Sequence, residues 1–129
     1  MGDIRGLLAR ALRDIKLARR FRQRKEYATT TMLYRKAIDK VLRALFIGKR
    51  NKAPPVGASA TYIATSIRMP EELMAEIMSL REDEDRMAEG WNGMRQWRTG
   101  CMARPEWEVV QIDELATKLM DSAMGYAKA

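Results

Sequence analysis

The sequence contains no histidine, which removes the side chain that enzymes most often use as a general acid or base near neutral pH. The same absence rules out helical di-iron sites built from paired Glu-x-x-His motifs. The single cysteine, Cys101, excludes an internal disulfide framework and a cysteine-based zinc site. The sequence also has no Gly-rich phosphate loop. We therefore expect no cofactor and no metal, and a binding role in preference to catalysis.

Long apolar runs are missing as well. A membrane-spanning helix needs about 18 consecutive apolar residues, and the sequence has no such run. The first residues, MGDIRGLLARAL, are charged and amphipathic, and they do not resemble a signal peptide. Because a lone cysteine also fits a reducing compartment, we expect a cytoplasmic protein without membrane contacts.

Glycine and proline are scarce, with eight and four residues among 129, and they cluster where loops are expected. The commonest residues are Ala, Arg, Met, Leu, Glu and Lys, most of which favour helices. No window alternates apolar and polar residues for long enough to predict a strand. We therefore expect residues 1–129 to form a single all-α domain, an antiparallel bundle of four to five helices.

The strongest helical pattern spans Tyr27–Ile47, which contains no Gly or Pro. One face of this helix carries apolar residues at spacings of four, three and four, namely Tyr34, Ile38, Val41 and Leu45. Further apolar residues widen the stripe: Tyr27, Leu33, Ala37, Leu42 and Phe46. A helix this apolar needs neighbours on more than one side. We predict that it is the central helix and that it ends at Gly48, a typical residue just beyond a helix C-terminus.

A first helix is predicted before it, with Asp3 as its N-cap. Its apolar stripe consists of Ile4, Leu8, Ala11, Ile15 and Ala18. The stripe is interrupted at Arg22–Lys25, which indicates a turn there. The alternative is one unbroken helix over residues 4–47, which would need a partner chain to cover it.

Three further helices are expected after the loop that contains Pro54 and Pro55. Ser59 can cap a short helix carrying Tyr62, Ile63 and Ile67. Pro70 begins a helix that should bury Leu73, Met74, Ile77, Met78 and Leu80. Residues 90–105, which include Trp91, Trp97 and Cys101, are predicted to form an irregular loop. The last helix should begin near Pro105-Glu106 and bury Val109, Ile112, Ala116, Leu119 and Ala123.

Charge is unevenly distributed along the chain. Residues 1–52 carry 16 Lys and Arg against four Asp and Glu, whereas residues 53–129 carry eight against 13. Either the two halves attract each other, within the fold or across a dimer, or the first half faces nucleic acid. The candidate phosphate-binding residues are those near the first turn and one ridge of the central helix: Arg19, Arg20, Arg22, Arg24, Lys25, Lys36, Lys40 and Arg43.

Two other features are weaker candidates for sites. The acidic run at residues 82–85 is the one candidate for a hard cation, but adjacent carboxylates on a helix point in different directions and seldom converge on one ion. The C-terminal methionines and three tryptophans favour a homodimer surface or a partner site, since Met adapts well at interfaces.

Several segments resemble, in the right order, the HEPN family of small helical bundles. Ala11, Asp14 and Ala18 match its opening A-x-x-D-x-x-x-A pattern. Lys36–Leu45, KAIDKVLRAL, is similar to the family's central V/I-E/D-K-x-L-K-A-L run, and Ala-Pro-Pro at residues 53–55 is similar to the connection that follows. Arg81, Arg86 and Trp91 fall in a segment that resembles the R-x-x-A-D-Y stretch of one HEPN subgroup.

The resemblance implies a helical fold and a partner, because HEPN proteins are often encoded beside a minimal nucleotidyltransferase. RNA-cleaving members carry Arg and His four to six residues apart beside a dimer interface, and a chain without histidine cannot hold that motif. Arg104 stands where the motif often begins, but Val109, Val110 and Gln111 follow it and cannot shuttle protons. Gly57-Ala58-Ser59 also replaces a common Thr-His pair.

Two functions follow from these patterns. The first is a non-catalytic, homodimeric HEPN-like interaction protein that partners a minimal nucleotidyltransferase in a toxin–antitoxin-like pair. The alternative is an RNA-binding or RNA-processing protein that uses the basic N-terminal half to bind RNA or nucleotides.

Overall fold

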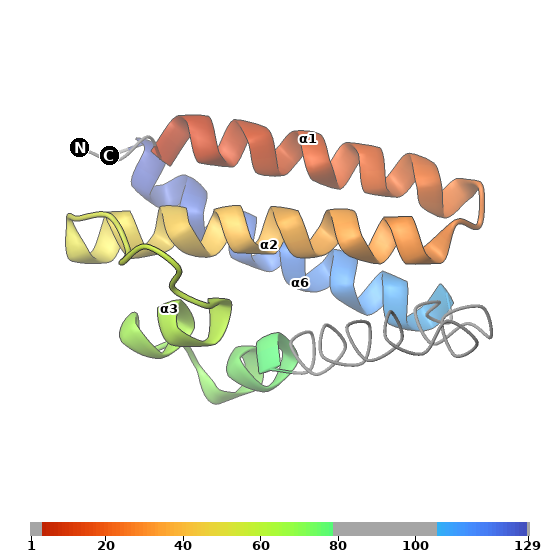
Figure 1. Cartoon of the computed structure of the whole chain (residues 1–129). Helices are drawn as coiled ribbons and strands as arrows, with labels where there is room; N and C mark the ends of the chain where they lie inside the picture. Colours follow the sequence, from red (N-terminus) through yellow and green to blue (C-terminus); the bar gives the residue numbers. More distant parts are fainter. Residues whose placement is uncertain (1–3, 79–105, 129) are drawn as a thin grey trace.

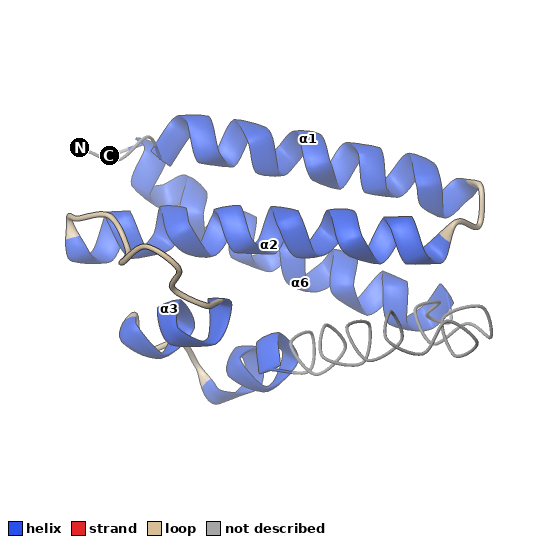
Figure 2. Cartoon of the chain, in the orientation of Figure 1, coloured by secondary structure: helices blue, strands red, loops and turns tan. Residues whose placement is uncertain are grey.

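The protein is a helical bundle in a computed structural model that describes residues 4–78 and 106–128. The helices are α1 (Ile4–Gln23), α2 (Tyr27–Arg50), α3 (Ala60–Ser66) and α6 (Glu106–Lys128), and residues 71–78 are helical as well. The described residues contain no strand (Figure 2). The all-α prediction is therefore confirmed.

Helices α1, α2 and α6 pack along their lengths, and α3 and residues 71–78 lie on another side of α2 (Figure 1). α1 and α2 form an antiparallel hairpin. α6 is antiparallel to α1 but parallel to α2, because Asp113 near its start contacts the start of α2 and Tyr126 near its end contacts Gly48. α1 therefore begins at the end of the bundle where α6 finishes (Figure 1).

The central position predicted for the second helix is confirmed. Eleven residues of α2 are buried, and they include all four residues of its predicted stripe. The predicted stripes of α1 and α6 are buried too, apart from Ile4, which is half-buried. Thr30 and Thr31 are fully buried on α2, and their hydroxyls donate to the carbonyls of Glu26 and Tyr27 at 2.8 and 2.9 Å. These bonds satisfy two polar groups that would otherwise be costly to bury.

The turn predicted near Arg22–Lys25 is confirmed, which excludes one unbroken helix. α1 ends at Gln23, and Lys25 adopts a left-handed conformation with φ 61°. The amide of Glu26 then donates to the carbonyl of Phe21 at 3.0 Å, and that of Lys25 to Arg22 at 2.9 Å. These bonds satisfy carbonyls that have no partner inside the helix.

The prediction that the central helix ends at Gly48 is wrong. α2 continues to Arg50, and Asn51 ends it in a left-handed conformation with φ 56°. A Cβ atom on Gly48 would lie 2.5 Å from Cγ of Tyr126. Gly48 therefore provides room for an aromatic ring of α6 rather than a helix terminus.

The short helices match their predictions in part. The Ser59 side chain caps α3 by accepting from the amide of Tyr62 at 3.1 Å, as expected. Ile67 is buried but lies just beyond α3. Ile77 is buried, whereas Met78 is 50% exposed, so the predicted burial of Met78 is wrong. Asp3 and Leu80 lie outside the described residues.

Candidate functional site

The most connected polar group in the described residues joins the three long helices. Asp113 on α6 accepts a hydrogen bond from the Tyr34 hydroxyl on α2. Its carboxylate also accepts two hydrogen bonds from the guanidinium of Arg19 on α1. The bond from Nε is 2.8 Å long and the bond from Nη2 is 3.1 Å long. Thr117, one helical turn further along α6, accepts from Arg19 Nη2 at 3.4 Å and donates to the Asp113 carbonyl at 2.9 Å. We call these four residues the Asp113 cluster.

The cluster forms where it does because its residues stand at the edges of three apolar stripes. Ile112 and Val109 are buried beside Asp113, and Ala18 is buried beside Arg19. Tyr34 is fully buried and has its hydroxyl at the end of a long side chain, so a polar partner is needed there. The carboxylate of Asp113 supplies it.

The cluster shifts three pKa values away from neutrality. Burial and then the hydrogen bond to Asp113 raise the pKa of the Tyr34 phenol above its ordinary value. Burial would raise the pKa of Asp113, but the hydrogen bonds from Arg19 and Tyr34 and the charges of Arg19 and Arg22 outweigh it, so the pKa lies below its ordinary value. The hydrogen bond to Asp113 raises the pKa of Arg19 in turn. Near pH 7 the phenol is therefore neutral and the carboxylate ionised.

Such a cluster is unsuited to proton transfer at neutral pH. An efficient general acid or base has a pKa near the working pH, and both Tyr34 and Asp113 are shifted away from it. Tyr34 is also fully buried, so its hydroxyl cannot reach a substrate. The arrangement instead satisfies a buried hydroxyl and fixes α6 against α1 and α2.

Three of the eight predicted phosphate-binding residues make ion pairs within the chain. Arg19 pairs with Asp113, and Lys40 pairs with Asp14 of α1. Arg43 contacts Asp39 at 2.9 Å, one turn earlier on α2, and donates to the Ala58 carbonyl at 3.3 Å. Lys36 is exposed. In the described part of the chain, it is the one residue of the ridge predicted along α2 that makes no ion pair.

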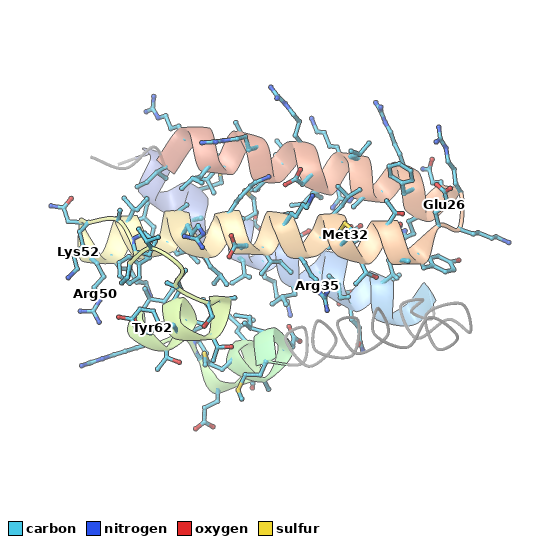
Figure 3. The ribbon with its side chains drawn as sticks, viewed as in Figure 1. Glu26, Met32, Arg35, Arg50, Lys52 and Tyr62 are labelled. Atoms are coloured by element: carbon cyan, nitrogen blue, oxygen red, sulfur yellow. The ribbon has the colours of Figure 1, made fainter. Side chains whose placement is uncertain are left out.

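The other predicted basic residues gather at the α1–α2 turn. Arg20, Arg24 and Lys25 are exposed there, and Arg24 lies over the Phe21 ring at 5.7 Å from its centroid. Arg22 is half-buried, and its charge acts on Tyr34 and Asp113. Glu26 is also at this turn, whereas Arg50 and Lys52 stand at the opposite end of α2 (Figure 3).

The cations at that opposite end contact the carboxyl end of α3. Lys49 donates to the Ile67 carbonyl at 3.3 Å, and Arg50 donates to that of Ser66 at 2.5 Å. Positive side chains are favourable at the carboxyl end of a helix. These contacts connect α3 to the end of α2.

Some candidates named from the sequence lie outside the described residues. They are the family-like residues Arg81, Arg86 and Trp91, the acidic run at 82–85, and Trp97, Cys101 and Arg104. Within residues 4–78 and 106–128, no three His, Cys, Asp or Glu side chains come together as metal ligands. None of the helices described is both long enough and apolar enough to cross a membrane.

Sequence reasoning missed the Asp113 cluster. The apolar spacing places Tyr34 in the core, which is correct for its ring, and it gives Asp113 no role. The one local signal was an acidic residue directly after the buried Ile112, at the edge of an apolar stripe. That position does not identify Tyr34 or Arg19 as partners, because they are 79 and 94 residues away in sequence.

The structure does explain two of the family-like segments. Asp14 belongs to the A-x-x-D-x-x-x-A pattern, and Lys40 belongs to the KAIDKVLRAL run. These two residues form an ion pair that links α1 to α2. The two segments therefore contact each other across the helical hairpin.

Comparisons with known proteins gave a match to one family model. No match was found among curated proteins or among solved structures. The family model described as the HEPN domain matches residues 4–95, which include α1, α2, α3 and residues 71–78. With most of its length matched and the paired motifs in place, the chain belongs to the HEPN family.

Proposed function

We propose that this HEPN protein acts by binding a protein partner and does not cleave RNA. The observation that carries the proposal is the state of the Asp113 cluster. Its acid, Tyr34, is held neutral and buried, and its carboxylate is held ionised by Arg19. Tyr34 is therefore a weak acid and Asp113 a weak base near pH 7, so both are poorly matched to proton transfer with a substrate.

The residue content supports the same reading. RNA-cleaving relatives use an Arg and a His four to six residues apart, and this sequence contains no histidine. The ion pairs of Arg19, Lys40 and Arg43 give these cations structural roles. They are therefore poorly placed to bind phosphates.

The partner we propose is a minimal nucleotidyltransferase, with the two proteins forming a toxin–antitoxin-like pair. Support for this partner comes from the family alone, whose members are often encoded beside such an enzyme. The basic charge of residues 1–52 suits an acidic surface on the partner, since opposite charges steer association.

Co-purification of the two proteins tests this proposal. We would co-express the full chain with the minimal nucleotidyltransferase encoded next to it, and purify the complex through a tag on either protein. We expect a stable complex on size exclusion, and saturable binding in calorimetry with the separately purified proteins. An unrelated nucleotidyltransferase is the control. Absence of binding in both experiments would overturn the proposed partner.

The alternative function is RNA binding at the α1–α2 turn. The observation that favours it is the exposure of Arg20, Arg24 and Lys25 in one short segment. Side chains at such a turn can reach several phosphates, and binding of this kind weakens steeply with salt.

Charge reversal tests the alternative. Replacing Arg20, Arg24 and Lys25 by Glu should weaken RNA binding and lower the slope of log K against log salt by about 2. Reversal of Lys52, Arg68 and Lys118, which are exposed elsewhere, is the matched control. No RNA binding at low salt, or equal effects of both triple variants, would contradict the alternative.

A further inference from the structure

The outer face of α1 carries a continuous basic stripe. Its residues are exposed and follow one another at spacings of three, four, three and four, from the helix into the turn: Arg10, Arg13, Leu17, Arg20 and Arg24. The opposite side of the helix carries the residues that α1 buries in the core, namely Leu8, Ala11, Ile15 and Ala18. Long side chains that end in nitrogen project from α1 away from the rest of the bundle (Figure 3). We call the five exposed residues the α1 outer stripe.

No acidic residue neutralises this stripe from within α1. The one acid in Ile4–Gln23 is Asp14, which forms an ion pair with Lys40 of α2. Arg13 and Arg20 make no hydrogen bond and no ion pair in the part of the chain that the structure describes. Each cation of the stripe has another cation three or four residues away, either in the stripe or at the exposed Lys16 beside it. Like charges at these spacings repel and weaken the helix.

The exposed face of α6 shows a different arrangement of charge. There Lys118 follows Glu114 by four residues and precedes Asp121 by three, so that opposite charges alternate along the helix. Exposed charges of mixed sign are sufficient to keep a helix face solvated. The outer stripe of α1 instead keeps an unfavourable repulsion, and an anionic surface that binds to the stripe removes it.

Leu17 indicates which kind of anionic surface fits. It lies at the midpoint of the stripe, between Arg13 and Arg20, and its side chain is 41% exposed. An RNA strand binds such a surface through its phosphates, which gain nothing from an apolar side chain among the arginines. A helix of a protein can present carboxylates and an apolar side chain together. The alternating spacing of three and four is also the spacing of the contact line between two packed helices.

We propose that the α1 outer stripe binds an acidic helix of a partner protein, with carboxylates opposite the arginines and an apolar side chain opposite Leu17. From Arg10 to Arg20 the stripe is about 15 Å long, which is nearly three turns of a partner helix. Arginine suits this contact because its guanidinium can hold a carboxylate through two hydrogen bonds. The inference rests on the proposed function only in taking the partner to be a protein.

Synthetic helical peptides test the stripe directly. The probe is an Ala-rich peptide, stapled into a helix, that carries Glu, Glu, Leu, Glu and Glu at spacings of three, four, three and four. A control peptide has the same composition but distributes the Glu residues around the helix. Fluorescence anisotropy with the full chain measures binding at about 0.15 M salt, where charges more than about 8 Å apart are largely screened. The probe should bind about tenfold or more tightly than the control peptide.

Variants of the protein separate the two parts of the contact. Leu17→Ala removes the apolar contact without a change of charge and should weaken binding of the probe about fivefold. The double variant Arg13→Glu and Arg20→Glu should weaken it about tenfold or more. The matched control reverses Lys36 and Lys118, which are exposed on α2 and α6, and gives the same net charge. Its affinity should stay within about twofold of wild type, because those charges lie away from the stripe.

A charge swap is the decisive step. The variant with Glu at positions 13 and 20 should bind a second peptide, in which Lys replaces each Glu of the probe, more tightly than wild type does. The same variant should unfold at a higher urea concentration than wild type, because the new carboxylates attract the neighbouring cations of α1. A purely structural stripe would give a lower urea midpoint instead. Circular dichroism checks that each variant is folded.

Four results would overturn the proposal. They are equal binding of the probe and the control peptide, no effect of Leu17→Ala, and no binding of the Lys peptide by the charge-reversed variant. The fourth is displacement of the probe by single-stranded RNA at lower concentration than by unlabelled probe, which would make nucleic acid the occupant. The peptides contain no nucleotidyltransferase, so these failures are distinct from a failure of the co-purification that tests the proposed function.

Discussion

Asp113 connects three helices through a single carboxylate. Its two oxygens accept hydrogen bonds from the Arg19 guanidinium, and one of them also accepts a hydrogen bond from the Tyr34 hydroxyl. The ion pair with Arg19 alone would contribute little to the free energy of unfolding, because the Arg19 side chain is 46% exposed and water screens its charge. The bond to Tyr34 matters more, because an unsatisfied buried hydroxyl is costly.

A double-mutant cycle tests the importance of this bond. We expect Asp113→Ala to lower the free energy of unfolding by about 2 kcal/mol, because it leaves the Tyr34 hydroxyl without its acceptor. Tyr34→Phe should cost about 1 kcal/mol, since Asp113 then keeps Arg19. In the Tyr34→Phe background, Asp113→Ala should cost about 1 kcal/mol less than in wild type. Urea denaturation measures all four proteins.

The control for this cycle is Glu76→Ala, which removes an exposed carboxylate from residues 71–78 and should change stability by less than about 0.5 kcal/mol. Strictly additive effects of Asp113→Ala and Tyr34→Phe would show that the two side chains are not coupled.

The pKa of Asp113 gives the stability a defined dependence on pH. Because the folded-state pKa lies below the ordinary value, the cluster stabilises the fold above the unfolded-state pKa of about 3.9. That contribution is lost as the pH falls through the folded-state pKa. The difference in unfolding free energy between wild type and Asp113→Asn should therefore shrink below about pH 4. Denaturant titrations between neutral and acidic pH measure it, and a constant difference would contradict the prediction.

At the scale of the elements, the long helices could be predicted because each carries an apolar stripe that local spacing reveals. The stripes of α1, α2 and α6 are buried as the spacing indicated. The end of α2 could not be predicted in the same way. Gly48 has the residue type of a helix terminus, but its function depends on Tyr126, 78 positions later in the chain. The actual terminus uses Asn51, which tolerates the left-handed conformation.

Two glycines in helices make a direct comparison. Gly48→Ala should lower the free energy of unfolding by about 1–3 kcal/mol, because the new Cβ would lie 2.5 Å from Cγ of Tyr126 and force α2 and α6 apart. Gly125→Ala on α6 has nothing within 4 Å and should raise it by about 0.5–1 kcal/mol through helix propensity. Thermal and urea denaturation measure both. A gain in stability for Gly48→Ala would show that the ring moves aside without cost.

For the whole molecule, the sequence predicted the family better than the site. Two of the HEPN-like patterns lie in α1 and α2, where local spacing and residue type carry the information, and the family match covers both helices. The roles of the charged residues were not predictable, because a cation that pairs across the bundle has the same local pattern as one that faces solvent. The local pattern groups Arg19, Lys40 and Arg43 with Arg20 and Lys36. In the structure, Arg19 and Lys40 pair with carboxylates on other helices, and Arg43 pairs with Asp39 one turn earlier on α2.

The same contacts fix the positions of the long helices relative to one another. The Asp14–Lys40 pair and the Asp113 cluster hold α1 against α2 and α6, and this fixes the outward charges of α1 relative to those of α6. In the function we propose, these polar groups hold the helices in place for binding a partner, and they do not transfer protons.

An RNA cleavage assay with protein in excess tests this central claim most directly. End-labelled single-stranded and structured RNAs would be incubated with wild type and with Asp113→Asn near neutral pH, and products followed on denaturing gels. The account predicts that the RNA stays intact with both proteins. The account would be contradicted by RNA cleavage activity that co-purifies with the wild-type protein over successive steps and that is lost in Asp113→Asn.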